Sequence, residues 1–208
     1  MHEKSQKNKN LALFDFDGTL CDKDSFTGFI FRVFPKRYIL RKGIKLSPWI
    51  TAYFLGYYPA HRMRPKLFHS IFKAVPKKQI HAVVEDYAQD LLDHLNPSLL
   101  QQLKKHQQNG DDVVLVSASV DIYLEPISNL LEVDLICTQT EYSSAHYTGF
   151  YRSLDCSCEQ KKVRVLEQYD LTEYDKIYAY GNSNEDLAML SLADYPYLTT
   201  QSQVLPPI

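Results

Sequence analysis

The sequence has few cysteines and glycines, and each shortage excludes a class of protein. Its 208 residues include four cysteines, which are too few and too unevenly spaced for a disulfide scaffold. Seven glycines and ten prolines exclude a collagen-like or low-complexity chain. With 45% of its residues hydrophobic, the chain is long and apolar enough to bury a sizeable core.

Long apolar runs are also missing. The first ten residues are polar and lack the apolar centre of a secretory signal. The longest stretch without Asp, Glu, Lys, Arg or His runs from Leu46 to Ala60, which is shorter than the roughly 20 residues of a membrane-spanning helix. We therefore expect residues 1–10 to form a flexible tail. We expect the protein to be cytoplasmic, with peripheral contact at the inner face of a membrane left open.

Acidic residues are almost absent from one segment. Residues 23–78 hold 13 of the 23 lysines and arginines but only one of the 25 acids, together with twelve aromatic residues. Such asymmetry indicates an anionic partner. A phosphorylated small molecule, a phospholipid headgroup and an anionic membrane all fit, and the alternative is a helical subdomain with a solvated basic face. We expect no nucleic-acid partner, because the basic residues form no known reading motif.

Predicted strands and helices alternate along most of the chain. The region from Ser25 to Asn109 is mostly helical, and 138–151 is a candidate hairpin. This order predicts an α/β fold, a Rossmann-like three-layer sandwich with a mostly parallel sheet. The predicted strands are Leu11–Phe16, Asp112–Ser117, Asp134–Cys137, Lys176–Tyr180 and Tyr195–Thr199, and the later predicted helices are Pro97–Asn109, Ile122–Leu131, one through Val163 and Leu166, and Glu185–Leu192.

Polar clusters follow three of the predicted strands. Asp15-Phe-Asp17-Gly-Thr19, Ser117-Ala-Ser119 and the stretch 182–186 would meet at one edge of a parallel sheet, while Lys161-Lys162 lies near a helix start. Asp15 and Asp17 would point to the same side of a strand and repel each other unless a hard cation such as Mg²⁺ lies between them. The turn at Gly18 would direct main-chain N–H groups toward an anion.

A calcium loop does not fit these aspartates. Counting from Asp15, Leu20 stands where glycine is required and Phe26 where a bidentate glutamate is required.

These motifs closely resemble the haloacid dehalogenase superfamily of phosphohydrolases. Residues 14–20 match its first motif, Val116-Ser117 the second, the lysine pair the third and residues 181–186 the fourth. The resemblance covers roughly residues 11–199, and it implies a core of residues 11–22 and 98–208. It also implies a helical cap at residues 23–97, as in the phosphoserine-phosphatase-like branch. The basic, aromatic cap resembles that of phosphatidylglycerophosphatase C-like members.

The resemblance implies roles for single residues. Asp15 would be the nucleophile that forms an aspartyl-phosphate, and Asp17 would act as general acid and then base. The phosphate-binding residues would be Thr19, Ser117, Ala118 and one of the two lysines. Lys162 is preferred because Val163 and Leu166 follow it with the spacing of the next helix, but Lys161 stays open.

The metal ligands implied are Asp15, Asp17, Asn182 and Asp186, with Asp186 holding either a metal-bound water or the lysine. Asn182 departs from the aspartate that many members carry, and an uncharged amide binds Mg²⁺ less strongly.

Three functions remain in competition. The first is an Mg²⁺-dependent phosphomonoester hydrolase acting on a phospholipid such as phosphatidylglycerophosphate, with residues 49–58 at the membrane interface. The second is a soluble phosphatase for a small metabolite such as phosphoserine, in which residues 49–58 form the packed core of the cap. The third is a catalytically silent binding module. In the first, the residues predicted to meet anionic headgroups are Lys36, Arg37, Arg41, Lys42, Arg62 and Arg64.

Overall fold

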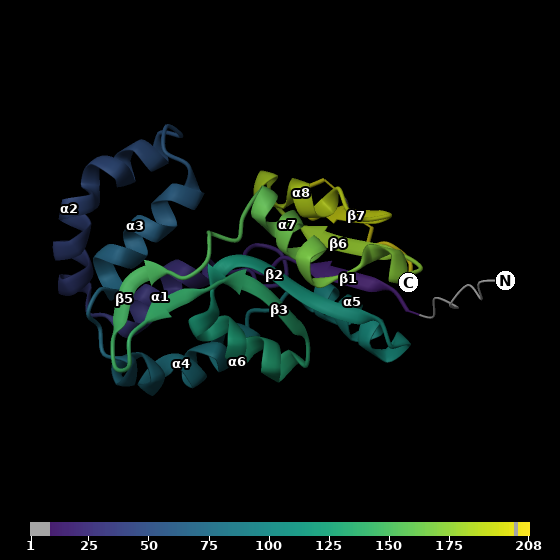
Figure 1. Ribbon diagram of the computed structural model, residues 1–208, viewed down its shortest axis with the longest axis horizontal. Helices are drawn as coiled ribbons and strands as arrows, with labels where there is room; N and C mark the ends of the chain where they lie inside the picture. Colours follow the sequence, from purple (N-terminus) through teal and green to yellow (C-terminus); the bar gives the residue numbers. More distant parts are fainter. Residues whose placement is uncertain (1–8, 202–203) are drawn as a thin grey trace.

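A five-stranded parallel sheet forms the centre of the protein (Figure 1). The computed structural model describes residues 9–201 and 204–208. The strand order is β3-β2-β1-β6-β7, and every neighbouring pair is parallel, which confirms the predicted α/β class. The strands are β1 (Leu11–Phe14), β2 (Asp112–Val120), β3 (Asp134–Thr138), β6 (Ile177–Gly181) and β7 (Tyr195–Leu198).

Helices cover both faces of the sheet. Alternate residues of β1 point to opposite sides, so that Ala12 and Phe14 join one hydrophobic cluster and Leu11 and Leu13 join another. The first cluster packs beneath α5 and α6, and the second beneath α7 and α8. This is the expected three-layer arrangement. The covering helices are α5 (Pro97–Asn109), α6 (Asp121–Leu131), α7 (Glu159–Gln168) and α8 (Leu187–Leu190).

The ends of α5 follow from its sequence. Asn96 caps the helix by accepting from the N–H groups of Ser98 and Leu99, and Gly110 ends it in the left-handed conformation at φ 77°. The expected helix over 185–192 is instead divided. A 3₁₀ turn, η2 (Asn184–Asp186), precedes the short α8, and a second turn, η1 (Leu171–Glu173), follows α7.

The insertion after β1 contains four helices, α1 (Ser25–Val33), α2 (Lys36–Phe54), α3 (Ala60–Phe72) and α4 (Lys77–Leu92). α2 and α3 extend away from the sheet as a pair (Figure 1). α1 and α4 instead share the first hydrophobic cluster with the sheet. Among the described residues, the structure contains no helix long and apolar enough to span a membrane.

A hairpin from the second half of the chain packs on this insertion. Its strands, β4 (Thr140–Tyr142) and β5 (Tyr147–Tyr151), are antiparallel, and β5 lies on α3. The Ala74 N–H donates to the Tyr147 carbonyl at 2.9 Å, and the Tyr147 N–H donates to Val75 at 2.9 Å. A Cβ at Gly149 would lie 3.0 Å from the Lys73 Cα, so only glycine allows this close approach. We call α2, α3 and this hairpin the lid (residues 36–72 and 140–151).

A buried group of hydrogen-bonded side chains connects α5 to β6. His106 is fully buried, with Nδ1 2.7 Å from Asp111 Oδ2 and Nε2 2.9 Å from the Tyr180 hydroxyl. Burial lowers the pKa of His106 although Asp111 opposes the shift. Asp111 also accepts from Asn10 through Oδ1, so residue 10 is fixed to the core. The rest of the predicted flexible tail, residues 1–8, lies outside the described residues.

Candidate active site

Polar residues at the ends of three strands, or directly after them, meet at one edge of the sheet. Phe14, the last residue of β1, pairs with Leu115 of β2 and with Tyr180 of β6. Because the three strands are parallel and in register, the residues that follow them emerge at the same level. Strand order also reverses here, since β2 and β6 flank β1. Sheets of this type bind their ligands at such a point.

Asp15 lies at this edge and is held by two donors. Lys161 Nζ is 2.5 Å from Asp15 Oδ1, and the Thr19 hydroxyl donates to Oδ2 at 2.7 Å. Burial raises the pKa of Asp15, while Lys161 opposes the shift. The two donors fix the orientation of the carboxylate.

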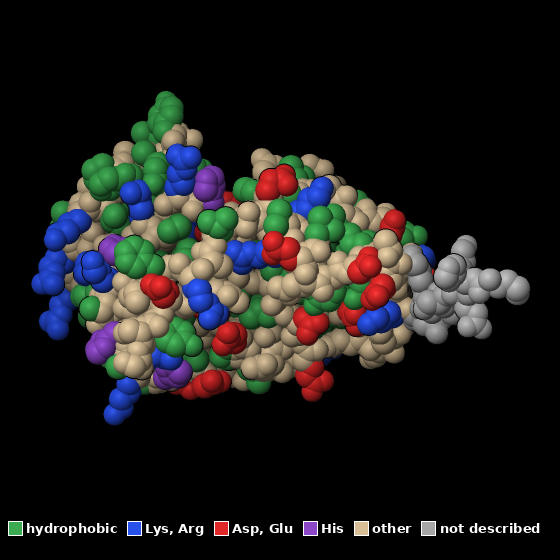
Figure 2. All heavy atoms as spheres, viewed as in Figure 1, with side chains coloured by type: hydrophobic (Ala, Val, Ile, Leu, Met, Phe, Trp, Pro, Cys, Tyr) green, Lys and Arg blue, Asp and Glu red, His purple; other side chains and the backbone are tan. Residues whose placement is uncertain are grey.

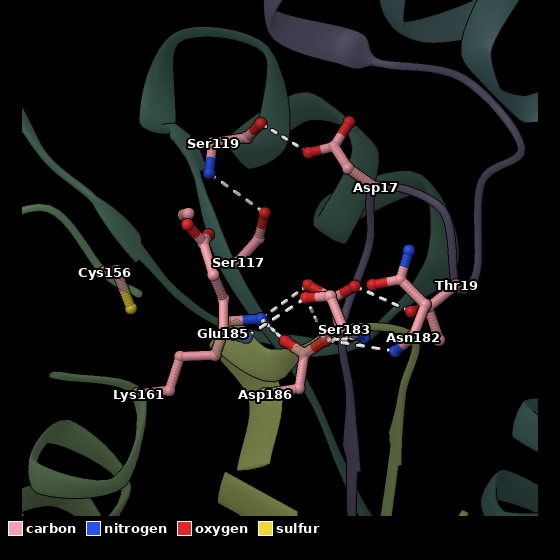
Figure 3. Close-up of polar contacts among 12 residues, drawn as sticks. Asp17, Thr19, Ser117, Ser119, Cys156, Lys161, Asn182, Ser183, Glu185 and Asp186 are labelled. Atoms are coloured by element: carbon pink, nitrogen blue, oxygen red, sulfur yellow. Dashed lines mark hydrogen bonds and ion pairs between the residues drawn. The ribbon is translucent and has the colours of Figure 1, made fainter. Parts of the chain in front are cut away.

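Lys161 is shared with a second carboxylate, that of Asp186 (Figure 3). Lys161 Nζ is 2.6 Å from Asp186 Oδ1, and Asp186 Oδ2 accepts from the N–H groups of Asn182 and Ser183 at 3.0 Å each. Burial alone would raise the pKa of Asp186, but the lysine and these donors hold it below its ordinary value. Burial disfavours the ammonium, yet the two carboxylates hold the pKa of Lys161 above its ordinary value. The structure thus shows Asp186 in contact with Lys161, which is one of the two roles predicted for it.

The preference for Lys162 over Lys161 is wrong. α7 turns Lys161 and Val165, one helical turn apart, toward the core, and both are buried. Lys162 lies on an outer side of the helix, where its ammonium meets a serine hydroxyl at 3.4 Å. The preference treated Val163 and Leu166 as marks of the helix face, but both are exposed.

The Asp17 carboxylate joins the sheet to the insertion. The Ser119 hydroxyl donates to Asp17 Oδ2 at 2.5 Å (Figure 3), and the Ser25 N–H donates to Oδ1 at 2.6 Å. Burial raises the pKa of Asp17, and these donors oppose the shift. A carboxyl group with a raised pKa is suited to carry a proton to and from a reacting group. Ser119 was missing from the predicted site, although its place in the polar cluster Ser117-Ala-Ser119, at the end of β2, is the signal that identifies it.

The turn after Asp15 differs from its prediction in two ways. The N–H groups of Gly18, Thr19 and Leu20 donate to main-chain carbonyls within the turn, so they do not face an anion. The Thr19 hydroxyl was expected to bind phosphate, but it donates to Asp15 and is buried. Both differences arise because the turn closes on itself around Gly18, at φ 75°.

Three of the predicted metal ligands that carry oxygen donors line one cavity: Asp15, Asp17 and Asn182. Asn182 lies directly against the turn, because a Cβ on Gly18 would be 2.0 Å from its Nδ2. This all-oxygen set fits Mg²⁺. In the described part of the chain, no three His, Cys, Asp or Glu side chains are grouped to hold a metal ion. A cation bound here would therefore need other oxygens beside the Asp15 carboxylate.

A cavity of about 460 Å³ lies between this edge and the insertion. Its floor includes Ser117 and Ala118, two of the predicted phosphate-binding residues, together with Lys161. The opposite wall is formed by α1, α2 and α3 and is mostly apolar. Its apolar residues include Phe26, Tyr53, Phe54, Met63 and Leu67.

Arg64 of α3 crosses from the lid to the core. Its Nε and Nη2 each donate to Asp155 at 2.8 Å, and Nη2 is 3.0 Å from Glu185 Oε2. The prediction that Arg64 meets anionic headgroups is therefore wrong. Its partners lie 91 and 121 residues further along the chain, so no local pattern could reveal them.

Comparison with known proteins gives a family for this arrangement. Residues 12–191 match the model of the haloacid dehalogenase-like hydrolases. A histidinol-phosphatase from Neisseria meningitidis serogroup C (strain 8013) is 26% identical over 204 residues, which cover 90% of this chain and 89% of that protein.

Two solved structures share the fold. A protein of unknown function from Bordetella pertussis Tohama I superposes with a TM-score of 0.74 at 23% identity, covering 94% of this chain and 92% of that one. A substrate-bound phosphoserine phosphatase superposes with a TM-score of 0.66 at 18% identity, covering 96% of this chain and 93% of that one.

Proposed function

This chain belongs to the haloacid dehalogenase-like hydrolase family and is a phosphatase, and we propose that it cleaves phosphate monoesters through an aspartyl-phosphate on Asp15. One observation carries the proposal. Asp15, with Lys161 2.5 Å away, shares a cavity with Asp17, whose pKa burial raises. A nucleophile, a cation and a proton carrier thus face the same space.

The first step transfers the phosphoryl group to the protein. An Asp15 carboxylate oxygen forms a bond to phosphorus while the bond from phosphorus to the alcohol oxygen breaks, and Asp17 gives its proton to that oxygen. Lys161 offsets the negative charge that collects beside Asp15. The Ser117 hydroxyl donates to a phosphoryl oxygen.

The second step releases inorganic phosphate. Asp17, now ionised, takes a proton from a water molecule as the water oxygen bonds to phosphorus and the bond to Asp15 breaks. Ser119 and Ser25 stabilise the ionised form of Asp17, because both donate hydrogen bonds to its carboxylate. One carboxyl group therefore serves both steps.

Mg²⁺ is the cofactor that the donor set fits, and Asp15, Asp17 and Asn182 would hold it. When bound, the ion supplies positive charge beside the phosphoryl oxygens. The silent-module alternative rested on Asn182 alone, and an amide oxygen remains a competent ligand for Mg²⁺.

The test is hydrolysis of a generic aryl phosphate with and without Mg²⁺. The wild type should release phosphate, and Asp15→Asn should lose at least about a thousandfold in kcat while it stays folded. Acid quenching during turnover should leave a phosphoryl group on the peptide that contains Asp15. Hydrolysis that survives in Asp15→Asn would overturn the proposal.

The cavity wall narrows the choice of substrate. Of the described residues that line it, only Arg64 and Lys161 are cationic, and both already pair with carboxylates. A leaving alcohol with an apolar part therefore fits the wall better than one with a carboxylate, such as the serine released from phosphoserine. Phosphatidylglycerophosphate supplies an apolar part through its acyl chains, and not through its headgroup.

A soluble amino-alcohol phosphate is the second candidate. The cavity also presents Asp24, an exposed carboxylate at the start of α1, which suits a cationic group on the substrate. The relative from Neisseria is named a histidinol-phosphatase. Comparing kcat/KM for histidinol phosphate, phosphoserine and phosphatidylglycerophosphate decides between the candidates.

A further inference from the structure

The outward face of α2 combines apolar and basic side chains. Leu40 and Ile44 are 67% and 65% exposed, and they lie one turn apart on the same side of the helix. Arg37 and Arg41 flank them and are also exposed. Figure 2 shows lysine and arginine side chains gathered along the outer edge of the molecule, over α2. An apolar stripe flanked by arginines is typical of helices that lie in a membrane interface.

The turn between α2 and α3 forms an apolar tip. Phe54, Leu55 and Tyr57 are 80%, 64% and 83% exposed, and the turn protrudes beyond the rest of the lid (Figures 1 and 2). The alternative that residues 49–58 form a packed cap core is thus wrong, because most of their side chains face outward. We call the outer face of α2 and this tip the lid patch (residues 37–45 and 54–57).

The lid patch itself carries charge of a single sign. No acidic residue occurs between Asp24 and Glu85. Two copies of the protein that met through this face would therefore bring like charges together, which disfavours a symmetric dimer. The tip is convex and apolar, so it matches a deformable layer better than a rigid groove.

The tip is continuous with the catalytic cavity. Tyr53 and Phe54 belong to the end of α2 and also line the cavity that contains Asp15. A surface bound at the tip would therefore adjoin the entrance to the active site.

We propose that the lid patch binds an anionic lipid bilayer and that the enzyme takes a phosphate monoester carried on a membrane lipid. The apolar tip would enter the interface while the arginines of α2 meet the anionic headgroups. The substrate part rests on the proposed phosphatase function, whereas bilayer binding does not.

The first experiment is sedimentation with vesicles of equal parts phosphatidylglycerol and phosphatidylcholine. The full chain should pellet with these vesicles, less so at high salt, and not with phosphatidylcholine alone. Arg37→Gln with Arg41→Gln should weaken partitioning about thirtyfold, from roughly one kcal/mol per basic residue. Leu55→Ser with Tyr57→Ser should weaken it about tenfold.

The controls change the same residue types elsewhere. Lys104→Gln with Lys105→Gln removes two exposed charges from α5, and Leu130→Ser removes an exposed apolar side chain from α6. Both should bind vesicles like the wild type. All variants should hydrolyse soluble aryl phosphate normally, while the lid-patch variants should lose hydrolysis of phosphatidylglycerophosphate in vesicles.

The outcomes separate the two proposals. An enzyme active on aryl phosphate that fails to pellet with anionic vesicles, or a dimer dissociated by Leu55→Ser with Tyr57→Ser, would overturn the membrane proposal alone. Binding to an acidic protein or to nucleic acid in place of vesicles would overturn it too. Protein that pellets but releases no phosphate from any monoester would instead overturn the phosphatase function.

Discussion

The Ser119 hydroxyl lies 2.5 Å from Asp17 Oδ2, which makes the end of β2 a support for the proton carrier. The hydrogen bond favours the ionised carboxylate and lowers the pKa of Asp17, against the effect of burial. Ser119→Ala should therefore raise that pKa. Because activity falls as Asp17 loses its proton, the alkaline limb of kcat/KM should move to higher pH. At neutral pH, kcat/KM should fall about tenfold, because ionised Asp17 loses the hydrogen bond that orients and stabilises it.

The control for this variant is Ser128→Ala, which removes a buried serine hydroxyl from α6. Its pH profile should match the wild type. An unshifted alkaline limb in Ser119→Ala would show that Asp17 does not set it.

The adjacent lysines offer a matched pair of variants. Lys161→Met removes the ammonium between Asp15 and Asp186 and should reduce kcat by about a hundredfold or more. Lys162→Met should stay within about twofold, because Lys162 lies on the outer side of α7. Equal losses in the two variants would contradict this assignment. Circular dichroism and the thermal midpoint establish that both variants fold.

Arg64 and Arg62 form a second pair, on α3. Arg64→Met breaks the partly buried ion pairs with Asp155 and Glu185 and should destabilise the protein by about 1–3 kcal/mol. Hydrogen exchange in α3 should quicken, because the lid loses this attachment to the core. Arg62→Met changes an exposed residue and should alter neither quantity. A stable, unchanged lid in Arg64→Met would refute the proposed attachment.

Asn182 tests the metal site. Asn182→Asp adds a formal charge beside Asp15, so the Mg²⁺ concentration for half-maximal activity should fall about tenfold. Asn129→Asp, on the distant α6, is the control and should leave the Mg²⁺ requirement unchanged. If Asn182→Asp also left it unchanged, the amide would not be a ligand.

His106 should make stability depend on pH. Burial lowers the pKa of His106 below the ordinary 6.5. Just below that pH, His106 is therefore protonated in the unfolded chain but still neutral in the folded protein, which favours unfolding. Its contribution is complete above 6.5 and is lost as the pH falls below that value. Urea unfolding at about pH 7.5 and about pH 5.5 should show the loss, and His106→Gln should reduce the difference between the two. An equal difference in His106→Gln would assign the effect to other groups.

The layers and the shared sheet edge could be predicted because they depend on local patterns. Apolar runs ending in Asp15 and Ser117 mark buried strands, and parallel pairing then brings their ends together. The sequence pattern was therefore enough to predict that Asp15 and Ser117 lie at the same edge of the sheet. Their chemical roles stay predictions.

The remaining details depend on contacts between distant segments. The choice between Lys161 and Lys162 is a rotation of about 100° around α7, and it is set by the burial of Val165 against the sheet. The inward direction of Arg64 depends on Asp155 and Glu185 in the core. No pattern within α3 contains that information.

The packing of β5 on α3 has a mechanical consequence. Because Gly149 lets the hairpin approach Lys73 closely, we expect the hairpin and α3 to move together. Four segments of the chain then connect the lid to the sheet, two from the insertion and two from the hairpin. We therefore expect the lid to tilt relative to the sheet and not to rotate away from it as a whole. A protease cut at the tip would leave both halves attached, one through α1 and the other through α4 and the hairpin.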